Sequence, residues 1–278
     1  MRAAIELSGL VLVNGAGPIN LGVSPGESLA VVGPGRGGKS LLISVLAGSA
    51  KPAQGRVRMT GVCEATGPIR SRRSTPMSLA PKDAGARAGE TLVALGLWNV
   101  RKTALSSLSP SQVAACELLG PLAERADVLL VDGTFDRLDP VSLAGALGLL
   151  RKRTGHGTIA VVATHRLDLL PHFDLVLALQ NGSPVLCGRV DELVASGGEA
   201  ELAIETDRHA AVRALAEPFA IEVRASNGGI VLRAGDAQGT AARLLSACYG
   251  DVRAIVMRRS NPGEQVLAAL QAEGRKVK

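Results

Sequence analysis

The amino-acid sequence predicts an α/β fold with a mainly parallel sheet and an N-terminal antiparallel edge, followed by a small C-terminal α+β domain. Strand-like apolar runs alternate with helix-like segments from the N-terminus to about residue 195, a rhythm typical of βαβ units. The runs at 29–32, 128–131 and 159–163 contain only Leu, Val, Ile and Ala. Such continuous runs are expected for parallel strands that are buried on both faces.

The N-terminal segment differs from these runs. Residues 5–13 and 18–23 show more alternation of apolar and polar side chains, which favours strands with one exposed face. Ser24-Pro-Gly26, directly after them, is a turn sequence. We therefore expect 5–13 and 18–23 to form the antiparallel edge.

A second unit is expected after Gly197-Gly198. Its elements are predicted as strand 202–206, helix 208–216, strand 219–223, strand 230–233, helix 237–248 and strand 252–257, with Asn227-Gly-Gly229 as a hairpin turn. This strand–helix–strand–strand–helix–strand order is ferredoxin-like. An amphipathic stretch at 264–270 follows. The predicted domains are therefore 1–196 and 199–278.

Composition indicates a globular protein without a disulfide framework. The 278 residues are 46% hydrophobic, and the four cysteines lack metal-ligand spacing, so we expect reduced thiols in a cytoplasmic protein. No signal peptide is recognisable, and no apolar run approaches the roughly 20 residues that cross a bilayer. The net charge of +6 comes with only 2% aromatic residues. Charged surface faces are therefore favoured over a nucleic-acid site, and no nucleic acid partner is expected.

The segment Gly33-Pro-Gly-Arg-Gly-Gly-Lys39-Ser40 lies between the run 29–32 and the helix-like segment 41–46. It predicts a phosphate-binding P-loop, because glycines let backbone N–H groups surround a phosphate at a helix N-terminus. Lys39 would reach the β- and γ-phosphates, and Ser40 would ligate Mg²⁺. A plain glycine-rich turn is the alternative. The expected nucleotide-binding residues are Gly33, Pro34, Gly35, Arg36, Gly37, Gly38, Lys39, Ser40 and Leu41.

Four further motifs follow in a fixed order. Leu108-Ser109-Pro-Ser-Gln112 precedes a predicted helix at 113–125, and the strand 127–132 ends in Asp132. Leu138-Asp139-Pro140 comes next, and Thr164-His165 closes the strand 159–163. Together with the P-loop and a hairpin-like segment at 180–188, this set resembles the ATP-binding subunits of ABC transporters over residues 5–195. The C-terminal unit is similar in layout to the appendage of drug-export-type ABC ATPases, and 258–267 resembles their closing helix motif.

The resemblance implies a P-loop NTPase core that binds ATP and Mg²⁺. In the family, two such domains enclose two ATP molecules, each between the P-loop of one subunit and the signature segment of the other. Carried over to this chain, Ser40 and Asp132 would hold Mg²⁺, and His165 would be the catalytic histidine near the γ-phosphate. Ser109, Gln112 and Asp139 would belong to the dimer site. A transmembrane permease would be the partner and would hold the chain at the cytoplasmic side of a membrane.

The chain departs from the family at the position of the general base. Gly133 follows Asp132, where the family has a glutamate that polarises the attacking water. General-base help is worth roughly 10² to 10⁴ in rate, so we expect hydrolysis to be weak or absent. Asp136, in the following turn, is an alternative base that its position disfavours.

The signature segment and two other positions also differ from the family pattern. Pro110 and Ser111 replace two glycines, which predicts poor binding of a partner's γ-phosphate; an ordinary helix start capped by Ser109 fits equally well. A strand is expected at 76–80, and Lys82 lies shortly after it, at the position where the family has a glutamine that contacts Mg²⁺. The Lys82 ammonium would attract the γ-phosphate; a plain surface lysine is the alternative. An adenine-stacking aromatic is missing near Val13-Asn14.

Only one helix, at 88–100, is expected between Lys82 and Leu108, so the helical subdomain is predicted to be shortened. The sequence as a whole predicts a degenerate ABC-type ATPase that serves as the ATP-binding subunit of a membrane exporter. Because both the base and the signature are altered, a heterodimer with a second, competent ABC ATPase is favoured over a homodimer. The alternative is a non-catalytic nucleotide sensor or scaffold that does not drive transport.

Overall fold

The computed structural model describes residues 4–13, 17–196, 200–226, 228–234, 237–247, 252–259 and 261–276. The chain forms two compact units, Met1–Arg189 with Ala268–Lys278, and Val190–Leu267. The predicted junction Gly197-Gly198 and the predicted turn residue Asn227 lie outside the described residues, as does Asn14. The boundary between 196 and 199 therefore stays a prediction.

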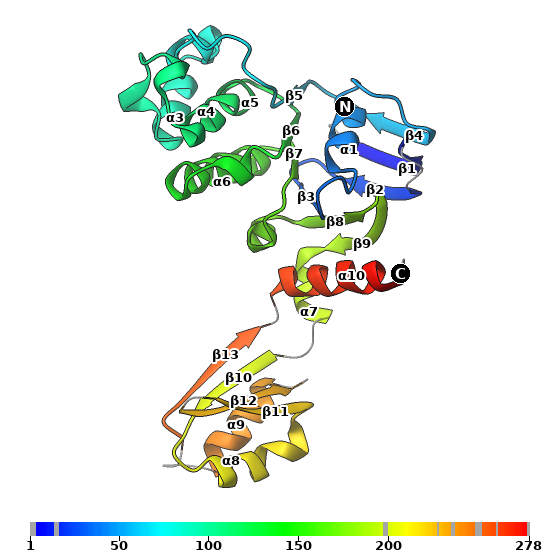
Figure 1. Ribbon diagram of the computed structural model, residues 1–278, viewed down its shortest axis with the longest axis vertical. Helices are drawn as coiled ribbons and strands as arrows, with labels where there is room; N and C mark the ends of the chain where they lie inside the picture. The colour runs from blue at the N-terminus through cyan, green and yellow to red at the C-terminus, as the bar shows by residue number, and fades with distance from the viewer. Residues whose placement is uncertain are drawn as a thin grey trace. The chain divides into compact units, whose positions relative to one another are not determined.

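The core of the first unit is a six-stranded sheet in the order β5-β6-β7-β3-β8-β9 (Figure 1). All neighbouring strands are parallel except β8 and β9, which form an antiparallel hairpin. The three continuous apolar runs are confirmed as β3, β6 and β7, and the segment 180–188 is confirmed as a hairpin. The strands are β3 (Ser28–Val32), β5 (Cys63–Ala65), β6 (Val128–Asp132), β7 (Ile159–Ala163), β8 (Leu175–Gln180) and β9 (Ser183–Arg189).

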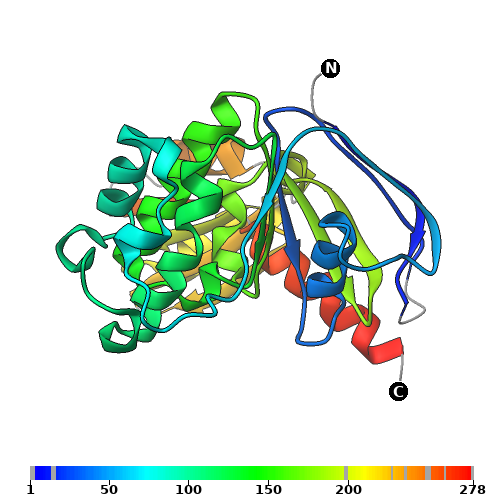
Figure 2. The ribbon, with the colours of Figure 1, turned by 90° about the horizontal axis from the view of Figure 1, so that it is seen from above.

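The N-terminal strands are antiparallel, as predicted, and form a separate three-stranded sheet in the order β2-β1-β4. These strands are β1 (Ile5–Val11), β2 (Ile19–Val23) and β4 (Gln54–Met59). Helix α1 (Lys39–Leu46) lies between this sheet and the core sheet (Figure 2). Its buried Leu42 and Ile43 share one apolar cluster with Leu7 of β1 and Leu130 of β6. The P-loop helix is therefore held from both sides.

Helical segments fill residues 76–123, which differs from the prediction in three places. The expected strand at 76–80 is wrong: Thr75 accepts a hydrogen bond from the backbone N–H of Ser78 at 3.2 Å and starts a helical turn with Pro76 at its first position. The expected helix 88–100 ends early, because Gly96 adopts a φ of 70°. The helix expected at 113–125 starts at Pro110 and is interrupted at Leu118.

The elements of this segment are α2 (Pro76–Leu79), η1 (Lys82–Ala84), α3 (Ala86–Ala94), η2 (Trp98–Val100), η3 (Leu105–Ser107), α4 (Pro110–Glu117) and α5 (Leu119–Ala123). The remaining elements of the first unit are η4 (Phe135–Arg137), α6 (Pro140–Gly155) and η5 (Leu167–His172). Helix α6 packs against α3 and α5.

Helix α6 approaches α3 most closely at Gly145. A Cβ atom at Gly145 would lie 1.8 Å from the carbonyl oxygen of Ala94. We expect Gly145→Ala to lower the free energy of unfolding by about 3 kcal/mol, because overpacking forces the two helices apart. Gly148, one turn later in α6, has no described atom within 4 Å of its Cβ position. Gly148→Ala should therefore raise stability by about 0.5–1 kcal/mol. Urea unfolding of both variants checks this, and equal effects would contradict it.

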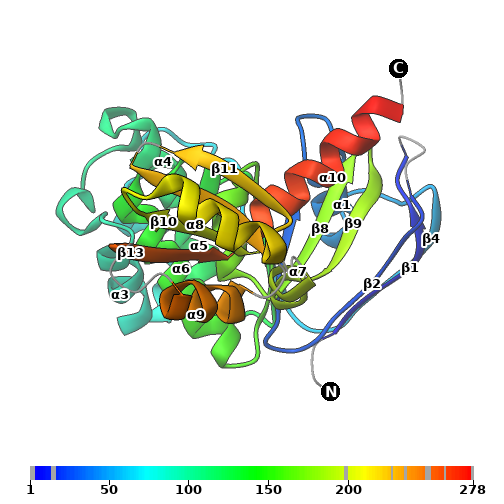
Figure 3. The same cartoon turned by 90° about the horizontal axis from the view of Figure 1, so that it is seen from below.

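The second unit has the ferredoxin-like topology that was predicted. Its sheet is antiparallel in the order β11-β12-β10-β13, with α8 and α9 on one face (Figure 3). Leu202, Val212 and Leu232 are fully buried in its own apolar cluster. The predicted strand 219–223 starts instead at Glu222, because Glu217–Phe219 form a 3-10 turn that contains Pro218. The elements are α7 (Val190–Ser196), β10 (Ala200–Glu205), α8 (His209–Ala216), η6 (Glu217–Phe219), β11 (Glu222–Ser226), β12 (Gly229–Ala234), α9 (Ala237–Ala247) and β13 (Ala254–Arg259). Helix α10 (Pro262–Lys276) begins in this unit and ends in the first.

Candidate functional site

The P-loop joins the buried strand β3 to helix α1 and needs its glycines. A Cβ atom at Gly33 would lie 2.0 Å from the carbonyl oxygen of Leu179 on β8, and its φ is 142°. Gly38 caps α1 with a φ of 99°. Because both conformations disfavour other residues, the loop can wrap tightly at the end of the sheet and present the first N–H groups of α1. This is the geometry that binds phosphate at a helix N-terminus.

Arg36 is a strained position within this loop. Its φ of 61° lies in the left-handed region, which costs a residue other than glycine about 1–2 kcal/mol. Its side chain is exposed and lines the pocket beside the loop. Backbone strain of this kind concentrates at binding sites. The sequence placed Arg36 in the loop but gave no sign of its conformation.

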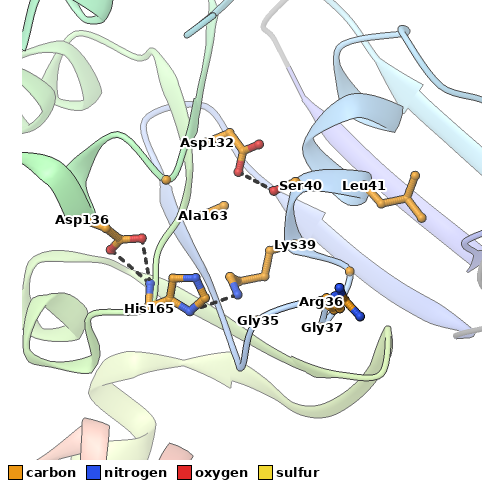
Figure 4. A pocket seen from close by; sticks show the side chains of 12 residues that line it. Gly35, Arg36, Gly37, Lys39, Ser40, Leu41, Asp132, Asp136, Ala163 and His165 are labelled. Atoms are coloured by element: carbon orange, nitrogen blue, oxygen red, sulfur yellow. Dashed lines mark hydrogen bonds between the residues drawn. The ribbon is translucent and has the colours of Figure 1, made fainter. Parts of the chain in front are cut away.

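A pocket of about 320 Å³ opens beside the P-loop (Figure 4). Most of the predicted nucleotide-binding residues line it, together with Asp132 and His165. Gly133, at the position of the missing base, and Asp136, the alternative base, line it as well, and Ala163 is the lining residue that was not predicted. The lining residues are Gly35, Arg36, Gly37, Gly38, Lys39, Ser40, Leu41, Asp132, Gly133, Asp136, Ala163 and His165. Gly33 and Pro34 are not among the lining residues, and their carbonyl oxygens accept hydrogen bonds from Lys39.

Lys39 is the buried cation of the pocket. Its side chain is 7% exposed, and its Nζ donates hydrogen bonds of 2.8 Å to the carbonyl oxygens of Gly33 and Pro34. Burial lowers the pKa of Lys39, and the charges of Asp136 and Asp132 oppose that shift. The ammonium therefore sits in a desolvated position, where attraction to an anion is strongest.

Ser40 and Asp132 bring two oxygen ligands together. The hydroxyl of Ser40 donates to Oδ1 of Asp132 at 2.9 Å, although the two residues come from α1 and the end of β6. The N–H of Asp132 donates to Oγ1 of Thr66 at 3.0 Å, which fixes the strand end. A hydroxyl and a carboxylate beside a phosphate cradle form the donor set that Mg²⁺ takes in nucleotide sites. The residues present therefore fit the predicted metal.

Gly133 leaves the base position without a side chain. It has a φ of 62°, and a Cβ atom built there would have only Oδ2 of Asp136 nearby, at 4.0 Å. Its N–H donates to the carbonyl oxygen of Ala163 at 3.0 Å, so the backbone is tied to β7. The pocket has space for a longer side chain, but the backbone is in a conformation that glycine prefers.

Asp136 lies in the pocket wall and holds the turn that carries His165. It accepts a hydrogen bond from the hydroxyl of Thr164 and bonds of 3.1 and 3.2 Å from the backbone N–H of His165. Nδ1 of His165 lies 3.1 Å from the carbonyl oxygen of Gly33, to which it donates when it carries the ring proton. Lys39 Nζ lies 3.4 Å from the same nitrogen. Asp136 is thus engaged in positioning His165.

The signature segment starts helix α4. Ser109 accepts from the N–H of Gln112 at 3.2 Å, and Gln112 Oε1 accepts from the N–H of Ser109 at 3.0 Å. This reciprocal capping box, with Pro110 at the first helical position, supports the helix-start interpretation of the segment. The contact made by Ser111 was not predicted. Its hydroxyl donates to Asp139 at 2.6 Å and accepts from the Asp139 N–H at 2.7 Å.

Ser109, Gln112, Asp139 and Lys82 are not among the residues that line the pocket. The first three lie at the N-termini of α4 and α6, where the dimer site was predicted. Lys82 begins η1 and is exposed. The roles assigned to these four residues stay predictions.

Asp139 caps helix α6 and should make stability depend on pH. The hydrogen bond from Ser111, followed by those from the Ser142 N–H and the Val141 N–H, lowers its pKa to about 2. The ordinary aspartate pKa is about 3.9, so this stabilisation is complete above that pH and is lost as pH falls through 2. We expect Asp139→Ala to cost about 1–2 kcal/mol at pH 6, with a difference that shrinks from pH 4 downward. Urea unfolding at pH 6, 4 and 3 measures it, and a pH-independent difference would contradict the assignment.

Comparisons with known proteins agree with this geometry. Residues 16–136 match the ABC transporter family model. Taurine import ATP-binding protein TauB of Pseudomonas aeruginosa is 31% identical over 189 residues, 60% of this chain and 71% of that protein. Lipoprotein-releasing system ATP-binding protein LolD 1 of Rhodospirillum rubrum is 31% identical over 201 residues, 60% of this chain and 87% of that protein.

Two further matches differ in what they cover. Mycobactin import ATP-binding/permease protein IrtB of Mycolicibacterium smegmatis is 30% identical over 205 residues; this is 63% of the chain, which spans only 35% of that protein. The solved structure of an ATP-binding subunit of an ABC transporter superposes with a TM-score of 0.62 at 17% identity, over 70% of this chain and 93% of the other, which shows the shared fold. None of these names is that of a drug exporter, so that subtype stays a prediction. The chain belongs to the ATP-binding proteins of the ABC transporter family.

Proposed function

We propose that this chain binds MgATP at the P-loop as the nucleotide-binding subunit of an ABC transporter and hydrolyses it slowly or not at all. The observation that carries the proposal is the contrast within one pocket. Lys39, the Ser40–Asp132 pair and His165 converge on it, while Gly133 offers no carboxylate. Binding groups are present, and the group that would accept a proton from water is missing.

Each binding residue has a definite task in this proposal. The N–H groups at the start of α1 and the Lys39 ammonium would hold the phosphates, and Ser40 with Asp132 would hold Mg²⁺. When bound, Mg²⁺ neutralises charge on the phosphate oxygens. His165 would contact the γ-phosphate from the position that Asp136 fixes. Asp136 itself is a poor replacement for the base, because its oxygens already accept hydrogen bonds from Thr164 and His165.

The proposed partners are a transmembrane permease and a second, competent ABC ATPase, which would place the chain at the cytoplasmic face of a membrane. No helix in the described part of the chain could span a bilayer. Met77 and Trp98, 54% and 43% exposed, lie on the helical segment 76–123, where the N–H of Met77 donates to the carbonyl oxygen of Arg101 and the Arg101 guanidinium stacks on the Trp98 ring. We propose this apolar surface as the permease contact. The exporter direction remains a prediction, because the relatives named above include import proteins.

A non-catalytic sensor or scaffold is the second candidate. The observation that favours it is the signature segment, where Pro110 lacks an N–H and Ser111 is committed to Asp139. Co-purification separates the two candidates. Recovery of the chain with a polytopic membrane protein, lost in Trp98→Ala, supports the transporter subunit. Recovery only in a soluble complex supports the sensor.

Binding and turnover should be measured on the same preparation. Calorimetry with ATP and Mg²⁺ should show one site per chain, and release of inorganic phosphate should stay at background. Phosphate release at the rate of an ABC ATPase that has its glutamate would overturn the proposal of a slow site. Absence of ATP binding would overturn the nucleotide assignment.

A further inference from the structure

A second pocket, of about 500 Å³, lies at the end of the core sheet opposite the P-loop. Its lining includes Asp127 just before β6 and Thr158 just before β7. The P-loop pocket contains Asp132 at the other end of β6. Since β6 and β7 run parallel, the two pockets are at opposite edges of the sheet. The second pocket is therefore independent of the nucleotide site.

Basic side chains dominate this pocket. Arg87 from α3, Arg125 before β6, and Lys152 and Arg153 from α6 all line it. The acidic groups in the lining are Glu90 and Asp127. Four cations against two carboxylates give the pocket an excess of positive charge.

Both carboxylates already have partners. Glu90 pairs with Lys152 at 3.0 Å, and Asp127 accepts from the backbone N–H of Val62 at 2.8 Å. The Nε of Arg87 donates to the carbonyl oxygen of Ala123 at 3.0 Å, which fixes its guanidinium in the wall. Glu90 is thus paired with Lys152 inside the pocket, and the three arginines remain against the single carboxylate of Asp127.

Arg153 is the least satisfied of these side chains. Its Nε is buried and has no hydrogen-bond partner among the described residues. Burial and the neighbouring charge of Arg87 both lower the pKa of the Arg153 guanidinium. A buried donor without an acceptor costs about 1–3 kcal/mol. An acceptor that carried negative charge would satisfy the donor and relieve the repulsion between the two arginines.

The presence of Arg153 at the end of α6 has a simpler explanation than ligand binding, because basic side chains are favourable at helix C-termini. The Nε of Arg153, however, does not bond to the carbonyl groups there. We propose that this pocket, formed by Arg87, Arg125 and Arg153, binds a phosphate group, either as inorganic phosphate or as a phosphate monoester of a small metabolite. Arginine forks match phosphate oxygens. The volume exceeds that of a phosphate ion and falls in the range of metabolite sites, and Leu122 and Leu149 supply apolar wall for an attached group.

The test must separate this pocket from the P-loop, which is also expected to bind phosphate. We would therefore titrate full-length Lys39→Ala with inorganic phosphate, and separately with glycerol phosphate, by calorimetry in a low-salt zwitterionic buffer. One site should remain, and adding Arg153→Gln should weaken it at least tenfold. Arg151, on the same helix but outside the pocket lining, provides the control: Arg151→Gln in the same background should leave affinity unchanged.

Tighter binding of one of the two probes would identify which form of phosphate the pocket takes, and either supports the proposal. No binding of either probe at millimolar concentration would overturn it. Equal losses in the Arg153 and Arg151 variants would also overturn it, because they would indicate a general charge effect. Arg153→Lys keeps the charge but loses the fork, so it should lose affinity while thermal unfolding without phosphate stays near that of the parent.

Discussion

Replacing Lys39 with alanine should weaken ATP binding by at least 100-fold, which calorimetry would record as loss of a measurable signal. The Nζ is the buried cation of the pocket and is held 2.8 Å from two carbonyl oxygens of the same loop. Without the Lys39 ammonium, the negative charge of a bound phosphate would not be balanced by a buried positive charge in the pocket. A 100-fold loss corresponds to about 2.7 kcal/mol, within the range for charge-assisted hydrogen bonds.

Lys51→Ala is the matched control for that experiment. Lys51 is an exposed lysine shortly after α1 and is outside the pocket lining. It should bind ATP as the unaltered chain does. Unchanged binding in Lys39→Ala, with the fold intact by circular dichroism, would remove the P-loop assignment.

Introducing a glutamate at Gly133 should raise ATP hydrolysis when the chain is paired with an ABC ATPase whose signature is intact. The expected gain is roughly 10- to 100-fold, at or below the lower end of the 10² to 10⁴ that a general base supplies. Two features of the structure reduce it. The φ of 62° costs a residue other than glycine about 1–2 kcal/mol. The new side chain would also begin 4.0 Å from Oδ2 of Asp136, a like charge.

Gly133→Gln is the control for the base, because it has the same shape and strain but cannot accept the proton. Thermal unfolding of both variants would report the backbone strain, which they share. Hydrolysis that rises equally in the glutamate and glutamine variants would show that packing, not a base, had been restored. No rise with any competent partner would show that the missing base is not the limiting defect.

Much of the fold was predictable from short segments of the sequence. The buried strands were predictable because short, continuous runs of Val, Leu, Ile and Ala are typical of parallel strands that are buried on both faces. The P-loop was predictable because its glycines, Lys39 and Ser40 lie within one short segment of the chain. The short helix α2 was missed because the capping box of Thr75 and Ser78 lies within a short, mostly apolar run, 76–80, that also suits a strand. The prediction of a strand at 76–80 did not take this helix cap into account.

The contacts of the site that were missed are those between distant residues. Asp136 reaches Thr164 and His165 only because β6 and β7 are neighbours, so that Asp132 lies beside Ala163. The order of strands in a sheet cannot be read from apolar runs. Ser111 and Asp139 are likewise 28 residues apart and meet where α4 and α6 begin. The left-handed conformation of Arg36 has no sequence signal at all.

The anchoring of His165 by Asp136 also links the pocket to the signature helix. The turn that contains Asp136 also contains Thr134 and Arg137, and both bond to Glu117 on α4, at 3.2 Å and 3.1 Å. A displacement of His165 by a bound phosphate would pull on Asp136, then on this turn, and then on α4. Whether or not the nucleotide is cleaved, His165 and the helix that begins with the signature segment are joined by one short series of hydrogen bonds.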